Sequence, residues 1–337
     1  MKHIFPLLGI LLIALTSCKN HETYIPKLNK LEPVEVNIVR FDNALMNVRS
    51  QSVREDVQIL YDEYPEFMDI FVEDILGIPS YDTVYLCEQL PKFLSDTVYG
   101  FKQTNELEKE MFHDIKDIET SINQAFTRIH YLYPEMVIPT LYFFISGFNS
   151  SIMFFSDNIA VGTDMYLGSD YPLYNRVVYD YQKYTMRKEC IPADVVSAYL
   201  FHNLTYTSTK NRLLDNMIYR GKIMYLLSLL LPEEKNYDIM GYTKEQWDWC
   251  CQHERAIWNL VMDKKDLFKT ESLTLTSYLN DGPFTSEVSQ DAPSRLGTWL
   301  GWRITESYMK NNPKVTLQNL ISEPDAENIL EYSNYRP

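Results

Sequence analysis

Basic side chains are scarce in this sequence, and their scarcity limits the partners of the protein. Of 337 residues, 31 are Lys or Arg and 46 are Asp or Glu, which gives a formal net charge of −15. Nucleic-acid binding depends on neutralising phosphates with Lys and Arg, so nucleic acid is excluded from the expected partners. The apolar fraction of 45% is typical of a folded domain and not of a disordered or fibrous chain.

Long hydrophobic runs are also missing beyond the N-terminus. The richest one, 223–231, has nine residues, whereas a helix that spans a membrane needs about 20. An earlier run, 4–15, follows Lys2 and leads into Leu15-Thr16-Ser17-Cys18. This pattern predicts a signal peptide over residues 1–17, and its end resembles the lipobox of bacterial lipoproteins. We expect Cys18 to carry acyl chains that tether the protein to a membrane without spanning it.

The remaining chain predicts a tether followed by one domain. Residues 18–33 are polar and contain two prolines, which favours a short linker between lipid and domain. Residues 34–337 show no internal repeat and no further linker, so we expect a single domain there. Asn20 stands where retention at the inner membrane commonly uses Asp, so we expect the outer membrane, on its periplasmic or its surface face.

Cysteines and catalytic signatures are equally few. After Cys18 the sequence has four cysteines, Cys87, Cys190, Cys250 and Cys251. They allow three pairings that the sequence does not rank, and they are too few for a disulfide scaffold. The sequence has no glycine-rich phosphate loop, no G-x-S-x-G elbow and no CxxC pair. The strongest generic signatures of nucleotide-binding, acyl-transfer and redox enzymes are therefore absent.

Apolar spacing predicts an α+β fold that is predominantly α-helical and has a small β-sheet. Alternation over 34–38 predicts an early strand, and short aromatic and β-branched runs between residues 140 and 161 predict the sheet. Steps of three or four predict one long helix over 104–133. Further helices are predicted from Ser52 to about residue 64, from Pro192, over 211–231, after a capping box at Thr243, and over 294–310.

Glycine spacing adds one packing prediction. Gly297 and Gly301 are four residues apart on the last of these helices, so they share one face. We expect a neighbouring backbone to pack close against that face.

Two stretches contain residue types that bind zinc in other proteins. Cys250-Cys251-Gln252-His253-Glu254 offers thiols and an imidazole, but the zincin motif H-E-x-x-H would need His where Ile257 stands. A packed helix with reduced cysteines is therefore favoured. In the other stretch, Ala198-Tyr199-Leu200-Phe201-His202 keeps only the second His of that motif. A lone His of this kind is usually a structural residue.

Short motifs run in order over nearly the whole chain. They are Cys18, Arg40-Phe41-Asp42, Ile145-Ser146-Gly147-Phe148, Gly162-Thr163-Asp164-Met165-Tyr166-Leu167-Gly168, Ile191-Pro192, Met217-Ile218-Tyr219-Arg220-Gly221-Lys222, Gly241-Tyr242-Thr243, Gly282-Pro283-Phe284 and Arg295-Leu296-Gly297-Thr298-Trp299-Leu300-Gly301-Trp302. Together they resemble the GldB family of gliding-motility lipoproteins of the Bacteroidetes and its relatives in non-gliding species.

This resemblance implies work in an envelope machine, in association with motility and secretion components. The family is similar in turn to zinc peptidases that keep H-E-x-x-H, which implies a zincin-like fold whose metal site has decayed. Ala198 and Arg220 would replace ligands, and Tyr199 would replace the base. Without these groups water is not activated, so we expect no metal, no cofactor and no catalysis.

The same comparison suggests where a binding cleft would lie. We expect it to be lined by two short segments and one helix face, which supply Asp164, Tyr166, Asp194, Tyr199, His202 and Arg220.

Two alternatives stay open. One is a zinc-dependent hydrolase with rearranged ligands, which would use His202 with Asp194 or Glu189, or Cys250 with His253. The other is a periplasmic lipoprotein that binds a glycan or a peptide in an aromatic cleft, a role that 25 tyrosines would suit.

Overall fold

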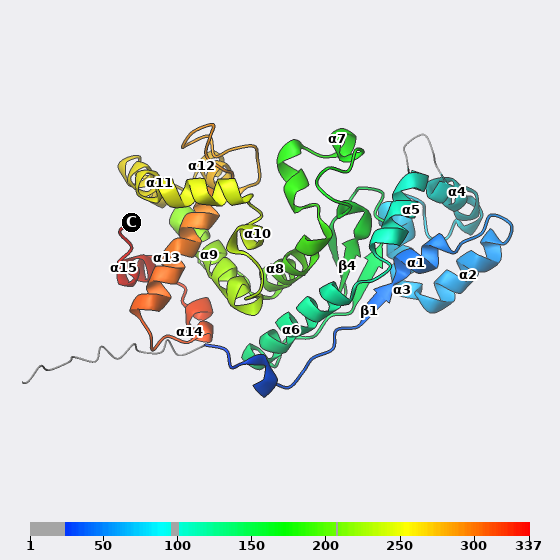
Figure 1. Ribbon diagram of the computed structural model, residues 1–337, viewed down its shortest axis with the longest axis horizontal. Helices are drawn as coiled ribbons and strands as arrows, with labels where there is room; N and C mark the ends of the chain where they lie inside the picture. The colour runs from blue at the N-terminus through cyan, green and yellow to red at the C-terminus, as the bar shows by residue number, and fades with distance from the viewer. Residues whose placement is uncertain (1–23, 96–100, 207) are drawn as a thin grey trace, which may run out of the picture.

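The computed structural model describes residues 24–95, 101–206 and 208–337, which form a mostly helical molecule around a four-stranded sheet (Figure 1). The strands are β1 (Ile38–Arg40), β2 (Leu141–Phe144), β3 (Ile152–Phe155) and β4 (Asn158–Gly162), in the order β1-β2-β4-β3. The first three in that order are parallel, and β3 pairs antiparallel with β4 at the edge. The predicted α+β, mainly helical class is confirmed. The predicted signal peptide 1–17 and Cys18 lie outside the described residues.

Helices precede and follow the sheet along the chain. Before it come α1 (Phe41–Met46), α2 (Val53–Glu63), α3 (Pro65–Ile70), the π-helical turn η2 (Phe71–Ile75), α4 (Thr83–Ser95), α5 (Phe101–Met111) and α6 (Lys116–Leu132). After it come α7 (Tyr174–Val177), α8 (Ile191–Asn203), α9 (Leu213–Leu230), α10 (Asn236–Met240), α11 (Lys244–Asp263), α12 (Ser272–Leu279), α13 (Leu296–Asn311), α14 (Leu317–Ser322) and α15 (Ala326–Ser333). Short 3-10 turns are η1 (Leu28–Lys30), η3 (Thr163–Met165), η4 (Asp180–Thr185), η5 (Lys188–Cys190) and η6 (Asp266–Phe268). None of the described helices is both long and apolar enough to cross a membrane.

The sheet separates two hydrophobic cores. Successive side chains of a strand point to opposite faces, so Phe143 enters the larger core with α6, α8, α9 and α13, while Phe144 enters the smaller core with α1 to α4. On β4, Val161 and Ala160 divide in the same way. Figure 1 shows α1 to α4 on one side of the sheet and α8 to α15 on the other.

The first strand begins later than predicted, because side chains of α6 accept the backbone N–H groups of the residues before it. The backbone N–H of Val34 donates to the Thr127 hydroxyl at 2.9 Å, and that of Val36 donates to the Asn123 side chain at 2.8 Å. These bonds replace ladder pairing, so regular strand geometry begins only at Ile38.

The prediction of one long helix over 104–133 is wrong, because the chain ends one helix and starts another inside that range. α5 ends at Met111 and α6 begins at Lys116. Between them the Asp114 carboxylate accepts the backbone N–H of Lys116 at 3.0 Å, and Arg40 donates to the carbonyl of Phe112 at 2.8 Å. Both apolar stripes face the larger core, so their spacing alone did not indicate the break.

The predicted close packing of a neighbouring backbone against the helix with Gly297 and Gly301 is confirmed at Gly301. A Cβ atom on Gly301 of α13 would lie 1.8 Å from the carbonyl oxygen of Met217 on α9. One on Gly221 of α9 would lie 2.1 Å from the carbonyl carbon of Gly301. The two helix backbones are therefore in direct contact.

Part of the predicted tether, described from residue 24 onward, lies against the domain. Tyr24 and Ile25 pack on the larger core, and the Tyr24 hydroxyl donates to the carbonyl of Met309 on α13 at 3.3 Å. Residues 28–30 form η1. The chain thus joins the domain close to α13, on the helical side of the molecule.

A buried acidic side chain lies where α5 meets η3. Glu108 is fully buried and its carboxyl group contacts the hydroxyl of Thr163, which also lies 2.9 Å from the carbonyl of Phe144. The Thr163 hydroxyl donates to the Glu108 carboxyl group and also lies within hydrogen-bond distance of the Phe144 carbonyl. Burial raises the pKa of Glu108 well above its usual value, and the nearby charge of Asp164 adds to the effect. Burial therefore favours the neutral form of Glu108.

We expect Glu108→Gln to raise the stability of the protein at pH 8. A folded-state pKa above the unfolded value gives stability that is present below about pH 4.5 and is lost as the pH rises toward the folded value. Gln keeps an oxygen that accepts the Thr163 hydroxyl and has no proton to lose. Thermal unfolding at pH 4.5 and pH 8 should show a gain that grows with pH, and no such trend for the exposed Glu110→Gln of the same helix. An equal effect at both pH values would contradict the assignment.

Candidate functional site

A cavity of about 310 Å³ lies between α8, the segment from η3 to η4 and the C-terminal helices. Side chains from α8, α9, the α10–α11 segment and the start of α13 face it. The lining is strongly polar and contains Ser151, Tyr166, Tyr181, Gln182, Thr185, Asp194, Ser197, Arg220, Asp238, Tyr242, Gln246, Asp281, Ser294, Arg295 and Thr298. Segments up to 150 residues apart in the sequence thus contribute to one cavity.

One wall of the cavity is formed where α8 contacts the residue that follows η3. Asp194 on α8 accepts a hydrogen bond from the hydroxyl of Tyr166 at 2.9 Å, and Tyr166 is almost fully buried. Burial raises the pKa of Asp194 to about 6, although the Tyr166 bond and the charge of Arg295 act in the other direction. Asp194 therefore changes charge close to neutral pH, which makes it the titrating group of this wall.

Three arginines lie in or next to the cavity, and two of them have an acidic partner. Arg295 lies 2.8 Å from the carboxylate of Asp281, and Arg187 lies 2.7 Å from that of Asp238. Arg220 instead donates from Nη1 to the carbonyl of Leu279 at 2.6 Å, and within the described residues it has no ion pair. Burial lowers its pKa, and the nearby charge of Arg295 adds to this. Arg220 thus brings a positive charge into the cavity without a contacting carboxylate.

Three of the six predicted cleft residues, Tyr166, Asp194 and Arg220, line this cavity, and the other three do not. The placement of His202 was wrong because a helix turns 100° per residue: two steps of four residues from Asp194 rotate the side chain by about 80°. The cavity face of α8 instead follows Asp194, Ser197 and Phe201. His202 is exposed and stacks on Phe154 of β3, with ring centroids 4.3 Å apart.

Asp164 and Tyr199 have structural contacts away from the cavity. Asp164 is fully buried, and its carboxylate accepts the backbone N–H groups of Ser146 and Phe148 at 2.8 and 2.7 Å. The Asp164 side chain thus connects the motif 162–168 with the motif 145–148. Tyr199 donates to the carbonyl of Val137 at 2.7 Å.

The sulfur and imidazole groups considered for zinc are also dispersed. Cys250 is buried and Cys251 is exposed on α11, and both are free thiols. His253 stacks on Trp249 with ring centroids 4.3 Å apart, and its Nδ1 lies 2.8 Å from the Trp249 carbonyl oxygen. In the described part of the chain, no three His, Cys, Asp or Glu side chains are grouped to hold a metal ion.

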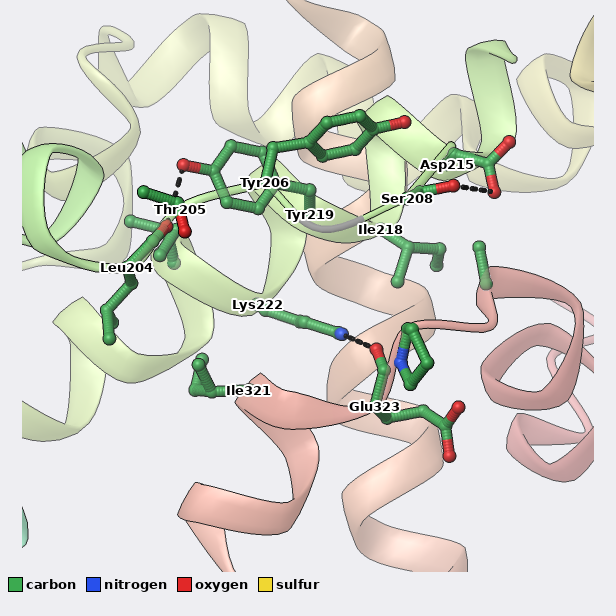
Figure 2. A pocket seen from close by; sticks show the side chains of 13 residues that line it. Leu204, Thr205, Tyr206, Ser208, Asp215, Ile218, Tyr219, Lys222, Ile321 and Glu323 are labelled. Atoms are coloured by element: carbon green, nitrogen blue, oxygen red, sulfur yellow. Dashed lines mark hydrogen bonds between the residues drawn. The ribbon is translucent and has the colours of Figure 1, made fainter. Parts of the chain in front are cut away.

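A second, much smaller pocket lies on the opposite side of α9 (Figure 2). Lys222 points into it and donates to the carbonyl of Glu323 at 2.5 Å. Burial lowers the pKa of Lys222 to about 8. The free space of about 20 Å³ holds one water molecule, so the larger cavity is the candidate ligand site.

Sequence reasoning missed several residues of the larger cavity. Arg295 and Thr298 lie within the Arg295–Trp302 motif, which could have indicated them. Asp238 lies on the short helix α10 and Asp281 between α12 and α13, and neither belongs to a sequence pattern. In the described residues the lining includes no histidine, cysteine or lysine. Its hydroxyls, guanidinium groups and carboxylates are suited to holding a polar ligand by hydrogen bonds and charge.

Comparison with known proteins identifies the family. No curated protein and no solved structure matches the chain. The model of the family described as gliding motility protein GldB matches residues 21–337, nearly the whole chain. The protein therefore belongs to the GldB family of gliding-motility proteins, a lipoprotein family by the name of its model.

Proposed function

We propose that the protein is a non-catalytic lipoprotein of the outer membrane, anchored through Cys18, that binds an envelope partner of motility or secretion type in its central cavity. The observation that carries this proposal is the composition of the cavity. Arg220, Arg295 and Asp194 converge there from three segments, and they offer charge and hydrogen bonds for binding. A nucleophile paired with a base is the usual requirement of covalent hydrolysis, and the histidines and cysteines of the described chain lie outside the lining.

Family membership supports the setting of this role. The match extends over the helices that build the cavity as well as over the sheet, so the cavity belongs to the family domain. The zincin-like ancestry suggested by the sequence stays part of this proposal. It would account for a cavity between a sheet-bearing half and a helical half in a protein that no longer binds metal.

A capture experiment tests the proposal. We expect full-length tagged protein, cross-linked in cells, to recover envelope proteins that Cys18→Ala does not recover. Ser197→Trp should reduce this recovery, because Ser197 faces the cavity and the indole would fill it. Asn203→Trp, on an exposed position of the same helix, is the matched control and should bind as the wild type does.

Two results would contradict the proposal. One is recovery that does not differ between the wild type, Cys18→Ala and Ser197→Trp. The other is stoichiometric zinc in protein purified without chelator that is lost in His202→Ala, which would favour a metalloenzyme instead.

A further inference from the structure

Two polar groups of the cavity have few or no hydrogen-bond partners among the described residues: the half-buried guanidinium of Arg220 and the buried hydroxyl of Thr298. Arg220 uses one of its five N–H donors, on the Leu279 carbonyl, and its charge meets no carboxylate within ion-pair distance in the described residues. Thr298 is 4% exposed and its hydroxyl has no hydrogen-bond partner. Both residues line the cavity. Unmatched donors in a preformed cavity are the feature expected of a site that a ligand completes.

The helices that carry the two groups both pack at the C-terminal end of α12. Arg220 binds the carbonyl of Leu279, the last residue of that helix. Gly297, next to Thr298, packs so close to α12 that an added Cβ would lie 2.9 Å from the carbonyl oxygen of Tyr278. Arg220 and Thr298 thus line one cavity from α9 and α13, two helices that both contact α12.

The backbones behind these side chains are held rigidly. Arg220 precedes Gly221, which touches Gly301 across the α9–α13 contact. The bond to the Leu279 carbonyl holds the guanidinium itself, so it loses little freedom when it binds a ligand, and its parallel donors match the two oxygens of a carboxylate.

We infer that Arg220 and Thr298 bind a carboxylate group of the ligand that enters the cavity. The inference rests on the binding role proposed above and names the chemistry of the group that is recognised. A carboxylate is favoured over a phosphate because Asp194, Asp238 and Asp281 also line the cavity and would repel a doubly charged group more strongly than a singly charged one. The carboxylate is that of a peptide C-terminus or of an acidic sugar, both of which fit the polar lining.

Binding of defined probes to detergent-solubilised full-length protein tests the inference. The first pair is acetyl-Ala-Ala with a free carboxylate and the same dipeptide as its amide. The second pair is glucuronate and glucose, and inorganic phosphate is a separate probe. We expect at least one carboxylate to bind with a Kd on the order of millimolar, as for a small fragment, and its uncharged counterpart to bind at least about tenfold more weakly. The pair that responds identifies the source of the carboxylate.

Substitutions connect this binding to the two residues. Arg220→Gln should weaken the bound carboxylate at least about tenfold, Arg220→Lys less, and Thr298→Val about threefold, because charge-assisted bonds are the stronger ones. Arg255→Gln is the matched control, since Arg255 also donates to a backbone carbonyl, that of Pro337 at 2.8 Å, but lies outside the cavity. Melting temperatures without probe show which variants are folded.

The inference is overturned if no carboxylate binds, if acid and amide bind equally, if phosphate alone binds, or if folded Arg220→Gln and Arg220→Lys both bind as the wild type does. These failures are distinct from failure of the proposed function. Envelope proteins captured through Ser197-dependent contacts, without carboxylate binding, would leave the partner role intact and remove only the chemistry assigned to Arg220.

Discussion

Gly301→Ala is expected to prevent stable folding. The added methyl group would lie 1.8 Å from the carbonyl oxygen of Met217, about half the usual contact distance. Relief requires moving α9 away from α13, and this would separate the largest core of the molecule. The loss should reach or exceed the roughly 4 kcal/mol that marks an exceptional substitution. Thermal unfolding, or the yield of soluble protein where no transition is seen, measures the effect.

Gly282→Ala is the control for this substitution. An added Cβ at Gly282 would meet nothing closer than the carbonyl oxygen of Phe284 at 3.9 Å, so we expect a melting temperature close to that of the wild type. If Gly301→Ala melts within a few degrees of Gly282→Ala, the α9–α13 contact is looser than described. The contact would then no longer explain how Arg220, the residue before Gly221, is held in position.

Asp164→Ala is expected to have the second-largest effect. The carboxylate of Asp164 is buried and accepts two backbone N–H groups, at Ser146 and Phe148. Both N–H groups belong to a loop in which Gly147 and Phe148 have positive φ, 66° and 61°. This conformation disfavours a side chain such as that of Phe. Each buried donor left unpaired costs about 1–3 kcal/mol. We expect a total loss of about 3 kcal/mol in urea unfolding.

Asp164→Asn separates the two contributions. An amide has one accepting oxygen, and its nitrogen can only donate, so it can satisfy one of the two N–H groups. We expect a loss between those of the wild type and Asp164→Ala. The exposed Asp170→Ala in a nearby loop should change stability by less than about 0.5 kcal/mol. A similarly small effect for Asp164→Ala would show that the loop does not depend on this carboxylate.

Local patterns predicted much of the fold, because each depends on neighbours in the chain. The capping box at Thr243 forms as expected, with the Thr243 hydroxyl accepting the Gln246 N–H at 3.2 Å. Pro192 lies in the first turn of α8, and the short aromatic runs are strands. At Ser52 the helix begins as predicted, but the hydroxyl donates to Asp56 at 2.9 Å and makes no cap bond.

The site was predictable only in part, since it depends on directions as well as on spacing. Tyr166, Asp194 and Arg220 were chosen from motifs and do share a cavity. His202 was chosen on the same helix, yet the rotation of α8 directs it to Phe154. Asp281 shows no pattern in the sequence, and it lines the cavity because it follows α12, which packs against α9 and α13.

Periodicity and glycine positions by themselves determined the α+β class and the close contact of two helix backbones, and the acidic excess predicts that nucleic acid is not a partner. Each of these follows from covalent geometry or from the sum of charges, both of which are local or additive. Only the tertiary structure decided that 104–133 is two helices, that Asp164 is a structural carboxylate and that Arg220 forms no ion pair with any of the described residues. Those outcomes depend on which groups from distant segments come within hydrogen-bond distance, and burial then determines which of them keeps its charge.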